Sequence, residues 1–319
     1  MAGLSFRVIE QEVVKRGACY RCLACVYACP LRSLEVEHGK PVLKGRCSAC
    51  GLCVTVCPSY ANRDVSSWSG LGEYVLAVKA RSLLRSVVER CEDGGAVTSL
   101  VLAGFREGFK PVVALGDSRE PLKPIYVVAE SEEKIVEATG SKYVFSTPIP
   151  ILAEMREKAL LVGLPCTTLA ARALLKARRI EAVLISLFCY TSFEESFVKL
   201  VRQLVAPLKP TKVSIKRGKL LIKADGREIL KPLKAVAETF RKPCYFCPDY
   251  TGLASDISAG SALEKGWTLL LIRSEKGLRL VRVAERLGLL ELTRASRDEL
   301  EAVARTCERK LARAAKFRK

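Results

Sequence analysis

The 319-residue sequence predicts an α/β protein built around a parallel βαβ unit and preceded by a small α+β module. The βαβ unit is indicated by two continuous apolar stretches that flank a helical pattern within residues 159–188. The small module is indicated by eight cysteines that all lie within residues 19–57. A segment this short buries too little apolar surface to fold alone, so metal ligation must supply much of its folding free energy.

The eight N-terminal cysteines form two copies of one spacing, C-x2-C-x2-C-x3-C-P. Three cysteines in one loop can bind three corners of a cuboidal iron-sulfur cluster, while the fourth points away and binds the other cluster. A structural zinc site usually spaces its thiolates as two separated pairs, so two 4Fe-4S clusters in a bacterial-type two-cluster ferredoxin domain are favoured. The first cysteine group is Cys19, Cys22, Cys25 and Cys57, and the second cysteine group is Cys47, Cys50, Cys53 and Cys29.

Beyond residue 65, where the composition changes, apolar spacing and turn residues indicate alternating helices and strands. The first expected elements are a helix over Leu83 to Glu92, strands over Pro111 to Gly116 and Ile125 to Ala129, and a helix that Ser131 caps and that ends at Gly140. Further along, we expect a hairpin-like stretch over Lys212 to Leu230, with turns at Arg217-Gly218 and Asp225-Gly226.

Another helix start is expected at Asp93, a candidate cap for a helix that runs to about Glu107. Gly94 and Gly95 allow close backbone approach, so free amide groups and the helix dipole would face an anion such as a pyrophosphate. Three nearby side chains could add hydroxyl donors or a charge: Thr98, Ser99 and Lys142. A plain capped helix with ordinary surface or packing residues is the alternative.

The clearest unit in the chain is a strand, a helix and a second strand. Ala159 to Leu164 and Ala182 to Phe188 are continuous apolar strands, and Thr167 to Arg179 has helical apolar spacing. The two strands are therefore expected to be parallel, with the helix as their crossover. Cys166 and Cys189 each follow the carboxyl end of a strand, which is where ligands gather in open α/β sheets.

Cys244 and Cys247 form a further pair, in the sequence C-x2-C-P. A single C-x2-C fits half a zinc site, a redox dithiol or half a cluster. Counting favours a third cluster, because the N-terminal ligands and these two later pairs leave only Cys91 and Cys307. The alternative is two inert buried cysteines and a redox pair.

Six motifs occur in a recognisable order: Glu92-Asp93-Gly94-Gly95-Ala96-Val97-Thr98-Ser99-Leu100, Gly140-Ser141-Lys142-Tyr143-Val144-Phe145-Ser146, Leu164-Pro165-Cys166, Leu187-Phe188-Cys189, Cys244-Tyr245-Phe246-Cys247-Pro248-Asp249-Tyr250 and Asp256-Ile257-Ser258-Ala259-Gly260-Ser261. Over roughly residues 75–290 the chain resembles the beta-subunit family of the coenzyme F-420 hydrogenases and dehydrogenases. It departs from the family pattern at two places. Tyr190 stands where many relatives have His, and Lys265-Gly266-Trp267 stands where a Trp-Gly pair is often seen.

The resemblance implies a flavoprotein that binds FAD and a 4Fe-4S cluster, and several family members carry an N-terminal two-cluster ferredoxin. The implied ligands of the additional cluster form a third cysteine group: Cys166, Cys189, Cys244 and Cys247. The implied FAD site includes Asp93, Gly94, Gly95, Thr98, Ser99, Ser141, Lys142, Tyr143 and Ser146. We expect a ferredoxin domain over 1–64, an FAD-binding part over 65–150, a part with the third cluster over 151–293, and a basic helix over 294–319.

The implied function is that of an oxidoreductase that passes electrons between coenzyme F-420 and a partner redox protein or complex. The deazaflavin coenzyme transfers a hydride whereas clusters accept single electrons, so FAD would convert between the two. No catalytic acid-base residue is required. Two alternatives are a ferredoxin-linked FAD reductase of an organic substrate and a non-catalytic electron-transfer subunit of a hydrogenase or dehydrogenase complex.

The formal net charge of +19 favours acidic partners, such as the phosphate and glutamate tail of the deazaflavin or an acidic redox protein. Nucleic acid is a competing interpretation, because the last segment combines an apolar helix face with basic residues. The apolar residues are Leu300, Val303, Cys307 and Leu311, and the basic ones are Arg305, Arg309, Lys310 and Arg313. No aromatic residue for base stacking lies among them, so a solvated basic helix packed on the domain is favoured.

Thiols and cluster ligands in a chain without a charged-then-apolar leader before Cys19 imply a reducing compartment, so we expect a cytoplasmic protein. No apolar run approaches the ~18 residues that span a bilayer. The single histidine, His38, is expected in an exposed loop rather than at a reaction centre.

Overall fold

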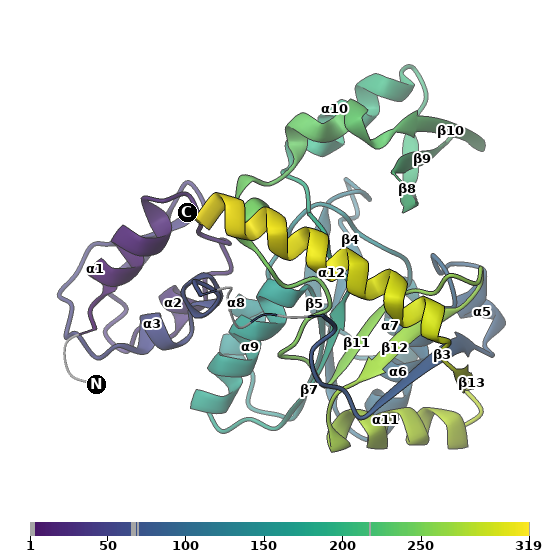
Figure 1. Ribbon diagram of the computed structural model, residues 1–319, viewed down its shortest axis with the longest axis horizontal. Coiled ribbons are helices and arrows are strands. Elements are labelled where there is room, and N and C mark those ends of the chain that lie inside the picture. The colour runs from purple at the N-terminus through teal and green to yellow at the C-terminus, as the bar shows by residue number, and fades with distance from the viewer. Residues whose placement is uncertain (1–3, 65–67, 69, 217, 319) are drawn as a thin grey trace.

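The structure is a computed structural model that describes residues 4–64, 68, 70–216 and 218–318. Its centre is an eight-stranded mixed sheet with the strand order β13-β3-β12-β11-β7-β6-β4-β5, which confirms the predicted α/β class. The N-terminal module lies at one end of the molecule (Figure 1). The central strands are β3 (Leu76–Ser82), β4 (Lys110–Gly116), β5 (Pro124–Val128), β6 (Ala159–Gly163), β7 (Ala182–Leu187), β11 (Ile257–Ser261), β12 (Thr268–Ile272) and β13 (Leu290–Arg294).

Helices cover both faces of the central sheet. Leu160 and Ile185 pack on α6 and α11 on one face, whereas Leu161 and Leu184 pack on α8 and α9 on the other. Strands that are buried on both faces read as continuous apolar runs, which is why β6 and β7 could be identified in the sequence. The helices are α5 (Arg85–Val88), α6 (Ala96–Arg106), α7 (Glu132–Glu137), α8 (Ile149–Glu154), α9 (Pro165–Ala177), α10 (Ser196–Val205), α11 (Glu275–Arg286) and α12 (Arg297–Arg318).

The predicted βαβ unit is confirmed. β6 and β7 pair in parallel, with Leu160 opposite Val183, and α9 connects them. β4 and β11 extend the parallel part of the sheet on either side. The carboxyl ends of β4, β6 and β7 therefore lie along the same sheet edge, where the segments that follow these strands meet.

The other predictions for residues 65–150 hold in part. The strands β4 and β5 are confirmed, and Ser131 caps α7 by accepting a hydrogen bond from the Lys134 amide over 3.3 Å. The helix predicted over Leu83 to Glu92 is wrong beyond Val88, where α5 ends. The chain turns there because the next residues must reach β3, where the Ser82 amide donates to the Gly94 carbonyl oxygen over 2.7 Å.

The N-terminal module packs directly on the central domain. Cys22, Ala24 and Val56 share an apolar cluster with α8 and α9, and the Thr147 hydroxyl group donates to the Cys22 carbonyl oxygen over 2.9 Å. His38 is exposed in the turn between β1 and β2, as predicted. The module consists of α1 (Phe6–Ile9), a π-helix (Glu10–Val14), α2 (Ala24–Tyr27), β1 (Leu34–Glu37), β2 (Lys40–Leu43), α3 (Leu52–Thr55) and α4 (Pro58–Ala61).

A small antiparallel sheet follows α10 and confirms the hairpin-like stretch. It consists of β8 (Pro210–Lys216), β9 (Lys219–Ala224) and β10 (Arg227–Pro232), and two 3-10 helices follow it, Leu233–Thr239 and Lys242–Phe246. Asp225 and Gly226 both have positive φ, 45° and 75°, as a tight hairpin turn requires. In the other predicted turn, Arg217 lies outside the described residues.

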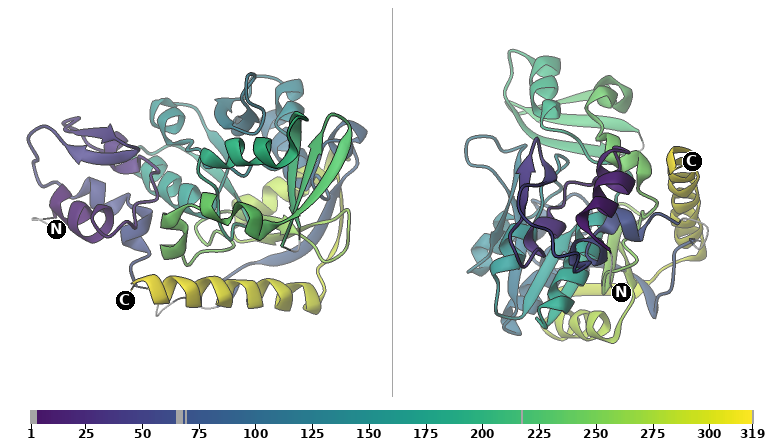
Figure 2. Two further views of the ribbon diagram at one scale, coloured as in Figure 1. Left: turned by 90° about the horizontal axis from the view of Figure 1, so that it is seen from above. Right: turned by 90° about the vertical axis from the view of Figure 1, so that its left-hand side faces the viewer.

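The final helix α12 runs along one side of the molecule and ends beside the N-terminal module (Figure 2). The Arg16 guanidinium donates to the Arg318 carbonyl oxygen over 3.0 Å at this junction. Val303 and Cys307 face the protein, as predicted, but Lys310 was wrongly expected on the solvated side and is only 2% exposed. None of the helices in the described part of the chain is long and apolar enough to cross a membrane.

Candidate functional site

The third cysteine group comes together at the edge of the central sheet. Cys166 lies in the first turn of α9, Cys189 follows β7, and Cys244 and Cys247 lie in and directly after the second 3-10 helix. Burial raises the pKa of the Cys166 thiol, and the thiols of Cys247, Cys189 and Cys244 raise it further. Four cysteines from three separate stretches of the chain therefore lie close together, with Cys247 buried and the other three partly buried.

A buried lysine borders this group. Lys310 of α12 donates from Nζ to the carbonyl oxygen of Cys189, and to that of Asp249 over 2.6 Å. Burial raises the pKa of Cys189 to about 12, and the Lys310 ammonium opposes that shift. A cation at this position favours negative charge on the cysteine sulfurs.

A buried arginine lies on the side of the group that faces the N-terminal module. Arg241 is 1% exposed, and its guanidinium lies 3.6 Å from the centre of the Phe145 ring. It donates to the Tyr20 carbonyl oxygen over 2.9 Å and lies 3.8 Å from a Glu194 carboxylate oxygen. The other oxygen of Glu194 accepts from Arg21 over 3.0 Å. This network ties the first cysteine loop to the third cysteine group.

The chemistry of the third group fits an anionic iron-sulfur cluster. Four thiols and two buried cations suit a cofactor that displaces the thiol protons and carries net negative charge. In the described ranges, no three His, Cys, Asp or Glu side chains are arranged to hold a metal ion. In a 4Fe-4S cluster each cysteine thiolate binds a different iron atom. The four cysteine sulfurs therefore surround the whole cluster rather than a single metal ion.

The cysteines of the first and second groups gather in the N-terminal module. Burial raises the pKa of Cys25, with further contributions from the thiols of Cys22, Cys57 and Cys19 and from that of Cys53 in the second group. Cys53 has a pKa raised to about 11, by burial and by the thiols of Cys47 and Cys50. Cys29 lines a small cavity together with the second group. Cys47 and Cys50 are exposed, so the second group lies at the surface of the module.

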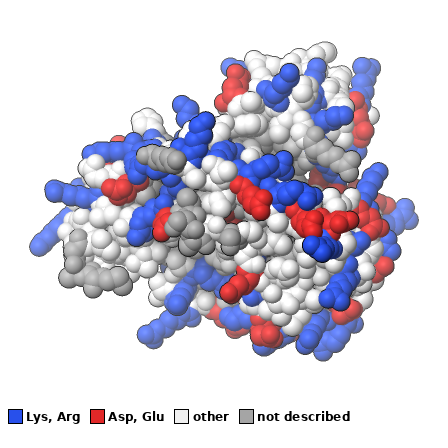
Figure 3. Space-filling model, in the orientation of Figure 1, with Lys and Arg blue, Asp and Glu red and all other residues white. Residues whose placement is uncertain are grey.

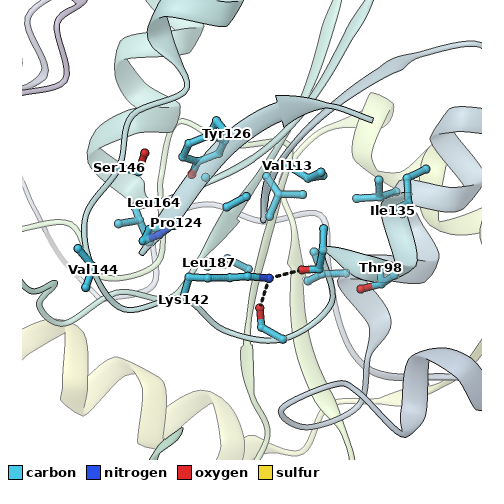
Figure 4. A pocket seen from close by; sticks show the side chains of 17 residues that line it. Thr98, Val113, Pro124, Tyr126, Ile135, Lys142, Val144, Ser146, Leu164 and Leu187 are labelled. Atoms are coloured by element: carbon cyan, nitrogen blue, oxygen red, sulfur yellow. Dashed lines mark hydrogen bonds between the residues drawn. The ribbon is translucent and has the colours of Figure 1, made fainter. Parts of the chain in front are cut away.

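A cavity of about 90 Å³ lies at the same sheet edge, between the helices α6 and α7 and the carboxyl ends of β4, β6 and β7 (Figure 4). Its lining is mostly apolar. Leu164 and Leu187 form part of its wall, and each lies two residues before a cysteine of the third group. Tyr126 also lines the cavity, and its pKa is raised by burial and then by the Cys166 thiol. The cavity and the third cysteine group are therefore neighbours.

Three of the nine candidate cofactor residues line this sheet-edge cavity: Thr98, Lys142 and Ser146. The Thr98 hydroxyl group is within 3.1 Å of that of Thr139. Lys142 donates to the carbonyl oxygens of Ala138 and Gly140, over 2.5 and 3.0 Å, at the end of α7 (Figure 4). Burial lowers the pKa of Lys142 to about 8. Its ammonium is therefore occupied by backbone acceptors rather than extended across the cavity.

The Asp93 turn has a different role from the predicted one. The cap at Asp93 is wrong, because α6 begins at Ala96 with Gly95 as its N-cap. The Asp93 carboxylate instead accepts hydrogen bonds from Lys216 over 2.7 Å and from Ser261 over 2.5 Å. These partners are distant in the sequence, and they hold the turn between the small sheet and β11.

Packing explains the two glycines of this turn. A Cβ atom on Gly94 would lie 2.6 Å from both the Ala80 carbonyl oxygen and the Thr268 amide nitrogen. Gly95 has a φ of 70°, in the left-handed region. Close backbone approach is therefore present, but its partners are β3 and β12 within the protein.

The remaining candidates lie outside the cavity wall. Ser99 is buried and donates to the Ser82 hydroxyl group over 2.8 Å. The Tyr143 hydroxyl oxygen accepts from the Ile215 amide over 3.0 Å, so this side chain joins the small sheet. Ser141 is exposed. Lys310 and Arg241 were not predicted as neighbours of the third cysteine group, because their partners are distant in the sequence.

The two cysteines expected to be free have no place in the three groups. Cys91 donates from its thiol to the Asp93 carbonyl oxygen over 2.8 Å. Cys307 packs with Leu269 and Val303. Both environments are those of structural thiols.

The fold agrees with the comparison to known proteins. Residues 77–153 match the family model for the N-terminal part of the coenzyme F420 hydrogenase/dehydrogenase beta subunit. Residues 156–298 match the family model for its C-terminal part. The chain belongs to this family. It is 28% identical to the coenzyme F420 hydrogenase subunit beta of Methanococcus voltae, over 69% of this chain and 84% of that protein.

Two further comparisons extend this result. The coenzyme F420-dependent sulfite reductase of Methanocaldococcus jannaschii is 28% identical, over 94% of this chain and 52% of that protein. A solved structure, a xenon derivative of the F420-reducing NiFe hydrogenase complex from Methanosarcina barkeri, contains a chain that superposes with a TM-score of 0.70. The identity there is 27%, over 77% of this chain and 91% of that chain.

Proposed function

We propose that this protein is an iron-sulfur flavoprotein that passes electrons between coenzyme F-420 and a partner redox protein or complex. The observation that carries the proposal is the contact between the sheet-edge cavity and the third cysteine group. Leu164 and Leu187 belong to the cavity wall. Cys166 lies two residues after Leu164, and Cys189 lies two residues after Leu187. A cofactor in the cavity would therefore lie next to a metal centre.

The sheet-edge cavity is suited to part of an FAD molecule. FAD, when bound, would supply the exchange between hydride transfer and single-electron transfer, which no side chain can perform. The apolar lining suits a planar aromatic ring, and Thr98 and Ser146 add polar side chains to the wall. FAD is larger than this cavity, so the rest of the molecule would lie outside it.

The positions of the cysteine groups support an order for electron transfer. Tyr20 neighbours Cys19 in the sequence and is buried, and its pKa is raised first by burial and then by the thiols of Cys247 and Cys166. The first group is therefore next to the third. The second group, with Cys47 and Cys50 exposed, provides an exit at the surface of the N-terminal module.

The surface charge suits an acidic partner at that exit. Figure 3 shows lysine and arginine side chains spread over the N-terminal module and along the rim of the central domain, with acidic residues between them. The net charge of +19 would accelerate encounter with an acidic redox protein. We propose such a protein, or an acidic subunit of a complex, as the partner.

The test is anaerobic reduction of the purified protein with reduced coenzyme F-420, compared with NADH and with reduced ferredoxin. Bleaching of the flavin band and of the cluster absorbance by reduced F-420, but not by NADH, is the expected result. Iron analysis should give about twelve iron atoms and one FAD per chain. No reduction by F-420 would contradict the proposed co-substrate, and about eight iron atoms with zinc making up the rest would remove the third cluster.

A second candidate is the electron-input module of a larger reductase of another substrate. It is favoured by the match to the F420-dependent sulfite reductase, because nearly the whole of this chain aligns with about half of that protein. In that case the N-terminal module would deliver electrons to a separate protein that carries the substrate site. Reduction by ferredoxin, with no response to F-420, would favour a ferredoxin-linked reductase instead.

A further inference from the structure

Lys310 is a buried cation whose ammonium is held by backbone carbonyl oxygens. Its side chain is 2% exposed and lies on the protein-facing side of α12, between Cys307 and Ala314. Its ammonium donates to two backbone carbonyl oxygens, those of Cys189 and Asp249. Burying an ammonium is costly unless negative charge nearby compensates for it.

The nearby groups show where that negative charge comes from. Asp249 is one source, but its carboxylate accepts from the amides of Gly252 and Leu253, over 2.7 and 3.1 Å. Lys310 contacts the carbonyl oxygen of Cys189, a member of the third cysteine group, and that of Asp249, which lies two residues after Cys247. Neutral thiols would offer little compensation, whereas thiolates bound to a cluster would offer a full negative field.

We propose that Lys310 raises the reduction potential of the cluster held by the third cysteine group. This inference rests on the proposed function. Reduction adds one negative charge to a cluster, and net charge, hydrogen bonding and solvent exposure set cluster potentials. A fixed ammonium next to Cys189 stabilises the reduced form more than the oxidised form. A cluster bound by the third cysteine group would thereby be a better electron acceptor.

The helix holds Lys310 in place through two further cations. Arg313 donates to the carbonyl oxygens of Tyr190 and Cys244, over 2.7 and 3.1 Å, and its guanidinium lies 4.3 Å from the centre of the Tyr190 ring. Arg318 donates to the Phe246 carbonyl oxygen over 2.7 Å. α12 therefore anchors to the loops on both sides of the third group. The family model ends at residue 298, so the family match does not extend to Lys310.

The test is a potentiometric titration of the anaerobically prepared protein, followed by electron paramagnetic resonance, with the variants K310M, K310R and R309Q. K310M keeps the length and removes the charge, and K310R keeps the charge. Arg309 is exposed and neighbours Lys310, so R309Q controls for net charge alone. In K310M the equilibrium constant for reduction of the third cluster should fall at least tenfold. This corresponds to a reduction potential lower by about 59 mV for one electron. K310R and R309Q should stay near the wild type.

Each outcome decides the inference. An unchanged potential in a K310M variant that retains its iron would overturn it, and so would loss of the cluster in both K310M and K310R, because Lys310 would then act by packing. Loss of the cluster in K310M alone, with K310R intact, would support the role of the charge. Iron analysis and resonance spectra of the wild type come first. If the wild-type protein holds no cluster at the third cysteine group, the proposed function itself is overturned. If the wild-type protein holds the cluster but its potential does not respond to K310M, only the role of Lys310 is overturned.

Discussion

The Tyr20 hydroxyl group donates a hydrogen bond over 3.3 Å to the carbonyl oxygen of Phe246, 226 residues away in the sequence. Tyr20 follows the first cysteine of the first group, and Phe246 lies between the two last cysteines of the third group. The Arg318 guanidinium completes the junction by donating to the Tyr20 hydroxyl oxygen over 3.1 Å. One buried tyrosine thus connects two predicted metal centres and the end of α12.

Replacing Tyr20 by Phe should weaken this junction without emptying either cysteine group. The loss of the hydrogen bond should lower the free energy of unfolding by about 1 kcal/mol, because the Phe246 carbonyl oxygen loses a buried donor. Chemical denaturation of the anaerobic protein measures it. Tyr27→Phe is the matched control, since Tyr27 is 41% exposed and should show no change. Equal stabilities for the two variants would mean that the Tyr20 bond contributes nothing to docking of the module.

Gly94→Ala should destabilise the protein strongly for a purely steric reason. The new Cβ atom would lie 2.6 Å from two backbone atoms, at Ala80 and Thr268, which cannot move without disturbing β3 and β12. We expect a loss of about 3 kcal/mol or more. Gly218→Ala is the control: Gly218 has a φ of +73° and open space around it, so backbone strain alone should cost about 1–2 kcal/mol. If the Gly94→Ala variant were more stable than the Gly218→Ala variant, the packing explanation would be refuted.

Lys142 should make stability increase with pH in the alkaline range. Its folded pKa is lowered to about 8 by burial, whereas the unfolded value is about 10.4. Between these values the unfolded chain binds more protons, so the unfolding free energy rises with pH, by up to about 3 kcal/mol in total. Urea denaturation of wild type and Lys142→Met at pH 7.5 and 9.5 measures the difference. The stability of wild type relative to the variant should improve at the higher pH, and a constant difference would contradict the burial of this ammonium.

Cys91 and Cys307 should be dispensable for metal binding. Cys91→Ser and Cys307→Ala should each retain about twelve iron atoms per chain. Cys307→Ala should cost about 1 kcal/mol, because Cys307 is buried against Leu269 and Val303. Iron analysis and denaturation give both quantities. A drop of about four iron atoms in either variant would place that cysteine among the ligands.

The sequence predicted well the features that depend on neighbouring residues. Cysteine spacing indicated that the eight N-terminal thiols lie in one module, because each C-x2-C-x2-C loop is a local structure. The βαβ unit was found for a similar reason, since strands buried on both faces carry long apolar runs. The turn at Asp225-Gly226 follows from two residues that tolerate positive φ.

The features that were missed depend on distant residues. Asp93 has the composition of a helix cap, but Lys216 and Ser261, 123 and 168 residues away, take its carboxylate. The buried position of Lys310 depends on Cys189, 121 residues earlier. Local propensity cannot indicate such partners, so the charged surroundings of the third cysteine group became visible only in the folded protein.

The proposed electron path is tested most directly by stopped-flow reduction of the Cys244→Ser variant by reduced coenzyme F-420, with flavin and cluster absorbance followed together. Cys244 belongs to the third group, and its carbonyl oxygen is held by Arg313. We expect the flavin to bleach still at close to the wild-type rate, while reduction of the two N-terminal clusters falls by at least tenfold. Unchanged reduction of the N-terminal clusters would contradict it, because electrons would then reach the module without passing through the third cysteine group.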